Sequence, residues 1–122
     1  MADSTKISTY RGKRYGNLCL VTVDDSPLDR RLDIVAVPLA DFEWGYNGAG
    51  PARLSFAILA HYFRDDGKAI EAYRTFCDLV VSEFREDDWS ITTKTISGYF
   101  QSTVEVTMTL SELLERARAL RE

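Results

Sequence analysis

Three glycines, Gly45, Gly48 and Gly50, precede Pro51 and an apolar run, and glycines before a helix can cradle a phosphate. A Walker loop needs a Lys-Ser or Lys-Thr pair after its last glycine, and none follows here. A dinucleotide-binding fingerprint reads Gly-x-Gly-x-x-Gly, whereas this stretch has the reverse order, Gly-x-x-Gly-x-Gly. Neither phosphate-binding motif is therefore present.

The start of the helix after these glycines offers a more general binding chemistry. We expect this helix to begin at Pro51, with Gly50 as its N-cap. The N–H groups of Ala52 and Arg53 would then lack partners within the helix, and the charge of Arg53 would oppose the helix dipole. We favour a structural turn here, and the alternative is an anion- or partner-binding site with four candidate residues: Gly48, Gly50, Ala52 and Arg53.

The residues just before this turn form a candidate protein interface: Trp44, Tyr46 and Asn47. Trp44 has two interpretations, because an indole can anchor a loop on the core or join an exposed aromatic patch. Anchoring is the favoured interpretation, since tryptophan is largely buried on average.

Basic residues in the first part of the chain form a candidate nucleic-acid site on a hairpin: Arg11, Lys13, Arg14, Arg30 and Arg31. The whole chain, however, has 19 acidic and 15 basic residues, and hence a formal charge of −4. Binding to phosphates needs clustered positive charge, so this balance argues against non-specific nucleic-acid binding. A nucleic-acid role is therefore an alternative and not the first prediction.

Histidine and cysteine are too few and too scattered for the common catalytic and metal sites. The single histidine, His61, lies on the apolar face of its expected helix, which is typical of a hydrogen-bonded core or rim residue. Cys19 and Cys77 fall in separate apolar patterns, as expected of reduced core thiols. The carboxylates between residues 24 and 43 do not have the spacing of a calcium loop. We expect no catalytic residue, no metal and no cofactor, and so a protein that is not an enzyme.

Hydrophobic periodicity places strands before helices, which predicts an α+β fold. Strands are expected over three segments: 10–15, 18–23 and 32–39. The first two form a hairpin around the turn pair Gly16-Asn17, residues 24–28 form a further turn, and Pro38 ends the third strand. The N-terminal antiparallel strands are therefore expected to precede a helical part.

Three to four helices are expected, with room for one late strand. The helix from Pro51 runs to about Phe63, and a second helix, capped by Asp65, runs to Phe84. The elements after it are an extended segment over 89–92, a helix capped by Thr92 or Thr93, a strand over 103–109 and a terminal helix from Thr109.

The length of 122 residues is enough for one domain with a core that needs no disulfide or metal. We expect residues 1–8 to be a frayed tail and residues 9–122 to be a single domain. No run approaches the roughly 18 apolar residues that cross a membrane, and the first residues lack the apolar centre of a secretion signal. The expected location is the cytoplasm, without membrane contact.

The glycine stretch, together with AIEAYRTFCDLVVSEF and WSITTKTISGYF, resembles a family of short proteins of unknown function. Members of that family occur in bacteria, archaea, plasmids and phages, and they share a Gly-Tyr-x-Gly-x-Gly-Pro-Ala core. The matching positions are Gly45, Tyr46, Gly48, Gly50, Pro51, Ala52, Leu54, Ala57, Leu59, Tyr73, Phe76, Trp89 and Thr92. The chain departs from the family at Asn47, Ala49 and Arg53, where the family has glycine, serine and glutamine.

The resemblance covers about residues 10–101, with residues 102–122 as an extension. It implies one compact domain in a mobile-element setting and supplies no activity. Our first functional prediction is a non-catalytic module that binds another protein through residues 42–53 and an adjoining helix face. Its narrower form is an inhibitor of host defence, such as an anti-CRISPR protein. The alternatives are a nucleotide- or phosphate-binding domain at Gly50–Arg53 and a nucleic-acid accessory protein; the oligomeric state is left open.

Overall fold

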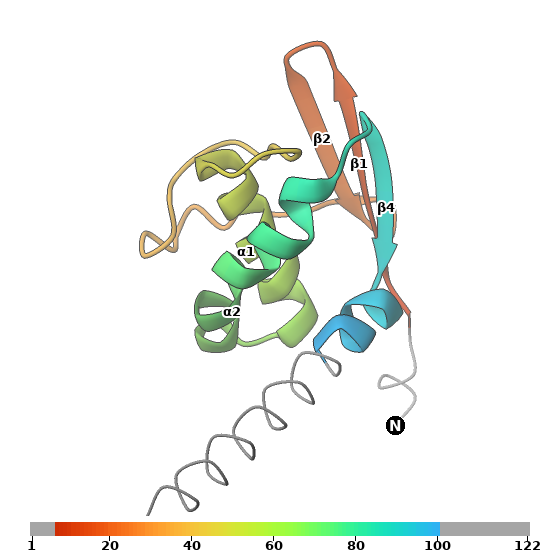
Figure 1. Cartoon of the computed structure of the whole chain (residues 1–122). Helices are drawn as coiled ribbons and strands as arrows, with labels where there is room; N and C mark the ends of the chain where they lie inside the picture. Colours follow the sequence, from red (N-terminus) through yellow and green to blue (C-terminus); the bar gives the residue numbers. More distant parts are fainter. Residues whose placement is uncertain (1–6, 101–122) are drawn as a thin grey trace, which may run out of the picture.

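A computed structural model describes residues 7–100, in which a four-stranded antiparallel sheet packs against helices (Figure 1). The strands are β1 (Thr9–Tyr15), β2 (Leu18–Val23), β3 (Ser26–Pro27) and β4 (Asp88–Thr92), in the order β3-β2-β1-β4. The helices are α1 (Ala49–Phe63), α2 (Asp66–Leu79), the 3₁₀ turn η2 (Val81–Glu83) and a helix that includes residues 93–100. The predicted α+β class and the N-terminal hairpin are confirmed.

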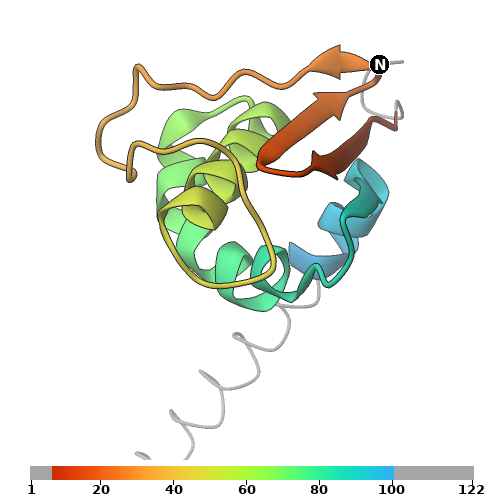
Figure 2. The same cartoon turned by 90° about the horizontal axis from the view of Figure 1, so that it is seen from above.

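The sheet has one covered face and one open face. Figures 1 and 2 both show α1 and α2 on the same side of the sheet. The covered face presents Tyr10 and Val21, which are buried, because side chains alternate along each strand. We call the opposite side the outer face, and its side chains are those of Arg11, Lys13, Tyr15, Leu18, Leu20, Thr22, Asp88 and Ser90.

Helix α1 is the centre of the core, because almost every residue from Gly50 to Ala60 is buried. It ends at Arg64, whose left-handed conformation turns the chain toward α2. The carboxylate of Asp65 accepts a hydrogen bond from the backbone N–H of Lys68, as the sequence predicts for this N-cap. The predicted continuation of α2 to Phe84 is wrong, since the helix ends at Leu79 and η2 follows.

Of two predictions about the segment after β2, the strand is wrong and the turn is confined to Asp24 and Asp25. Residues 32–39 form no strand, and the chain has no helix or strand from Leu28 to Gly48. Within the predicted turn, Ser26 and Pro27 instead form β3, which pairs with the end of β2. The predicted strand over 103–109 and the terminal helix lie outside the described residues, as does most of the predicted tail over 1–8.

Gly12 lets two layers of the core approach each other closely. It lies opposite Trp89 in the β1–β4 pairing, and a Cβ at Gly12 would overlap the indole of Trp89. That indole stacks on Phe84, with ring centroids 4.5 Å apart, and meets Trp44 edge-on at 5.5 Å. A side chain at Gly12 would therefore disturb an aromatic cluster that joins the sheet to the segment after α2.

We expect Gly12→Ala to lower the free energy of unfolding by about 1–3 kcal/mol, because the new methyl group overpacks this cluster. Urea denaturation of the two proteins measures the difference. Gly98→Ala is the matched control, because a Cβ there meets no atom within 4 Å and alanine favours helices by up to about 1 kcal/mol. Equal stability of the Gly12→Ala variant and the wild type would contradict the close packing described here.

Candidate functional site

Arg53, the predicted anion-binding residue, is completely buried, with 0% of its side chain exposed. Its guanidinium donates hydrogen bonds of 2.6–3.3 Å to five backbone carbonyls of the segment between β3 and α1, those of Arg30, Arg31, Ile34, Val37 and Pro38. Burial lowers the pKa of Arg53, while the nearby carboxylate of Asp33 opposes that shift. The donors of Arg53 are directed to the protein's own backbone and not to solvent.

The start of α1 also differs from the prediction. The helix begins at Ala49 with Gly48 as N-cap, and the N–H of Ala52 donates to the carbonyl of Gly48 at 3.0 Å. The predicted unpaired N–H of Ala52 is therefore wrong. Gly50 has a packing role, because a Cβ there would lie 2.7 Å from the Cβ of Glu43. Ala52 and Gly50 therefore have structural roles at the start of α1.

The three predicted interface residues lie in different environments. Trp44 is buried, its Nε1 donates to the carbonyl of Glu86 at 3.0 Å, and it anchors the segment on the core. It therefore cannot belong to an exposed aromatic patch. Asn47 is exposed, but its amide donates to Asp78 at 2.7 Å. Tyr46 is exposed and its ring lies over Gly48, so one aromatic side chain of this segment faces solvent.

Three of the predicted nucleic-acid residues are paired with carboxylates. Arg14 donates to Glu43 at 2.7 Å and to Asp87 at 2.8 Å, and its guanidinium lies 4.7 Å from the ring centroid of Trp44. Arg31 is likewise held between two carboxylates, and Arg30 pairs with one; these acidic partners are Asp33, Asp66 and Asp41. These three arginines are therefore neutralised by carboxylates close by, which makes them less available to phosphates.

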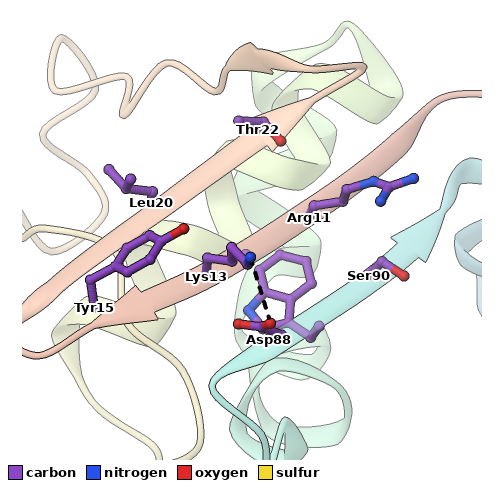
Figure 3. A pocket seen from close by; sticks show the side chains of 9 residues that line it. Arg11, Lys13, Tyr15, Leu20, Thr22, Asp88 and Ser90 are labelled. Atoms are coloured by element: carbon purple, nitrogen blue, oxygen red, sulfur yellow. Dashed lines mark ion pairs between the residues drawn. The ribbon is translucent and has the colours of Figure 1, made fainter.

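The two remaining basic residues, Arg11 and Lys13, lie on the outer face of the sheet. This face forms a shallow concavity of about 730 Å³, and Figure 3 shows its labelled side chains on β1, β2 and β4. Tyr15, Leu18 and Leu20 on the hairpin are 55%, 56% and 47% exposed. The pairing of Tyr15 with Leu18 and of Lys13 with Leu20 brings these apolar side chains beside a cation.

Arg11 and Lys13 of the outer face belong to the predicted nucleic-acid site, but the apolar residues beside them were not among the predicted sites. The signal for them was present in the alternation of the hairpin, because Leu18 and Leu20 occupy the same side as Lys13 once the register is known. The sequence predicts a strand over 18–23 buried on one face and partly on the other, whereas the structure leaves the second face open. Lys13 approaches Asp88 at 3.9 Å, a distance typical of a weak, solvated ion pair.

The groups with catalytic potential have structural partners. The Tyr10 hydroxyl lies 2.7 Å from Nδ1 of His61, and burial together with the nearby Asp24 raises the pKa of Tyr10. Burial also raises the pKa of Cys19, as does its contact with Glu43, so the thiolate is disfavoured. Within residues 7–100 no group of three His, Cys, Asp or Glu residues is arranged to hold a metal ion.

Residues 10–102 match a family of unknown function (DUF6166), and the chain belongs to that family. The predicted resemblance to a family of unknown function over about residues 10–101 is thereby confirmed. No curated protein and no solved structure matches the chain. Among the described residues, no helix combines the length and the apolar character that crossing a membrane requires.

Arg53→Met should reduce the free energy of unfolding by at least about 3 kcal/mol, because the apolar side chain leaves five backbone carbonyls, that of Val37 buried, without their donor. Urea denaturation followed by circular dichroism measures this loss. Arg30→Met is the control, since Arg30 is exposed and its ion pair with Asp41 should contribute less than about 1 kcal/mol. Similar losses in the two variants would contradict the proposed role of Arg53.

Glu43 should give a pH-dependent stabilisation. Burial opposes its ionisation, but hydrogen bonds from Arg14, Cys19 and the Trp44 backbone outweigh it and lower the pKa of Glu43 below the usual 4.5. A carboxylate with a lowered pKa stabilises the fold above its unfolded-state pKa and loses that effect as the pH falls through the folded-state value. We expect Glu43→Gln to be less stable than wild type by about 1 kcal/mol at pH 7, with the difference shrinking below about pH 4.5.

Denaturation curves recorded between neutral and acid pH test this expectation. Asp41→Asn serves as the control, because Asp41 is a highly exposed carboxylate in a surface ion pair. A difference between wild type and Glu43→Gln that stays constant down to acid pH would contradict the assignment.

Proposed function

We propose that this member of the family of unknown function is a non-catalytic module that binds another protein, and that it does so through the outer face of its sheet. The observation that supports the proposal is the row of exposed apolar side chains on the hairpin, Tyr15, Leu18 and Leu20, on a face that no described helix covers. Contiguous exposed apolar surface is uncommon on monomeric proteins and marks interaction sites.

The chemistry of this face indicates the kind of partner. Tyr15 offers a rigid aromatic anchor, and aromatic residues are enriched among those that contribute most to binding. Arg11 and Lys13 border the apolar row, and the single carboxylate of the rim, Asp88, lies 3.9 Å from Lys13. A partner surface that carries apolar side chains flanked by carboxylates would complement this pattern.

This proposal relocates the binding surface predicted from the sequence. Residues 42–53 were expected to contact the partner, but Trp44 and Arg53 in that segment are buried. The narrower prediction of an inhibitor of host defence carried by a phage or plasmid stays a proposal, and it rests on the sequence resemblance. It specifies that the partner comes from the host.

Capture from host lysate with variants of the outer face tests the proposal. We expect wild-type protein to retain a stoichiometric partner protein and Leu20→Asp to bind that purified partner at least about tenfold more weakly, because a carboxylate replaces an apolar contact. Leu79→Asp is the matched control, since Leu79 is 58% exposed but lies at the end of α2. It should bind as wild type does.

Two results would contradict the proposal. The first is equal weakening by Leu20→Asp and Leu79→Asp, which would place the interface elsewhere. The second is the absence of a protein partner combined with salt-sensitive retardation of DNA or RNA that depends on Arg11 and Lys13, which would favour the nucleic-acid alternative.

A further inference from the structure

Strand β2 has an edge that β3 covers only in part. β3 pairs with the last two residues of β2, Thr22 and Val23, and one further bond joins the N–H of Leu28 to the carbonyl of Val21 at 3.0 Å. Along the first part of β2, from Leu18 to Leu20, no described strand lies on this side. Half of the strand is therefore an open edge.

The backbone groups at this edge are directed away from β1. The hydrogen bond from the N–H of Leu28 shows that the backbone groups of Val21 point toward β3. Because this direction alternates from one residue to the next, the N–H and C=O of Cys19 point the same way. No described residue makes a backbone hydrogen bond to the N–H or C=O of Cys19 or to the N–H of Val21 on this side. These groups have the spacing of a sheet ladder and fit the backbone of another extended chain.

A recess of about 500 Å³ lies along this edge, between β2 and the segment of residues 41–43. Its apolar lining comes from Leu18, Leu20, Leu28 and Phe42. Three charged residues border it: Arg30 and Asp41 pair with each other, and Glu43 pairs with Arg14. The recess therefore offers apolar contacts, backbone groups and charges that already have partners.

The opposite edge of the sheet, formed by β4, is a less suitable site for an added strand than β2. Proteins protect open edges with charges or proline, and β4 begins with Asp88, directly after Asp87. The sequence of β2, Leu-Cys-Leu-Val-Thr-Val, has neither a charge nor a proline. An uncharged open edge beside an apolar recess is the arrangement that strand addition uses.

We infer that the partner adds an extended segment with apolar side chains to the open edge of β2, with main-chain hydrogen bonds to Cys19 and Val21. The inference rests on the proposed function and specifies how that partner is held. Apolar side chains of the segment would contact Leu18 and Leu20, which border both the recess and the outer face. A second copy is a poorer fit, because the β2 edge of each copy is bordered by its own residues 41–43.

Cys19→Pro tests the inference, because proline removes the N–H that points to the edge while the bonds from β2 to β1 stay intact. The probe is a set of short random peptides displayed on phage and selected on the full chain. Selected peptides should bind Cys19→Pro at least about tenfold more weakly, and they should slow amide hydrogen exchange at Cys19 and Val21 in the wild type. Cys19→Ala keeps the N–H and should bind as wild type does.

Other results would overturn strand addition, the choice of partner, or both proposals. Peptides that are sensitive to Leu20→Asp, but not to Cys19→Pro, and that leave the amides of Cys19 and Val21 unprotected would overturn strand addition and leave the proposed function standing. If the wild type self-associates and the Cys19→Pro variant is monomeric, the segment added to β2 comes from a second copy of the chain, and the assignment to a different partner is overturned. The absence of any bound peptide and of any captured protein would overturn both proposals. If Cys19→Pro does not fold, amide exchange in the wild type decides.

Discussion

Arg53 holds the irregular segment between β3 and α1 through five backbone carbonyls, and the position of that segment determines much of the remaining surface. Long connections without secondary structure are uncommon in small domains unless they are functional or disordered. Here the buried guanidinium replaces the hydrogen bonds that a helix or strand would have supplied. The segment in turn brings Glu43 within 2.7 Å of Arg14 and places Phe42 beside β2.

The ion pairs of the structure explain why its charged residues give little indication of function. Arg14 and Arg31 are each held between two carboxylates, and Arg30 pairs with Asp41, so these three arginines are neutralised locally. The apolar residues of the hairpin stay exposed, although Nζ of Lys13 lies 5.9 Å from the centroid of the Tyr15 ring. The binding surface that we propose is an apolar row with two cations at its border, together with an open strand edge.

The sequence predicted the elements whose signals are local. The Gly16-Asn17 hairpin and the Asp65 cap of α2 depend on residues next to one another, and both are confirmed. Residues 32–39 have the composition of a strand, but their carbonyls bond to Arg53, which is distant in the sequence, and the segment stays irregular. The roles of Arg53 and of the outer face depend on which segments pack together, and single-sequence patterns do not contain that information.

Hydrogen exchange of the protein alone and in complex with its captured protein partner tests the central claim most directly, since it compares the outer face with the glycine segment in one measurement. The account predicts slower exchange in the complex for residues 18–21, at the open edge of β2, and unchanged exchange for residues 44–53. Protection confined to residues 44–53 would contradict the account and return the binding surface to the segment around Arg53.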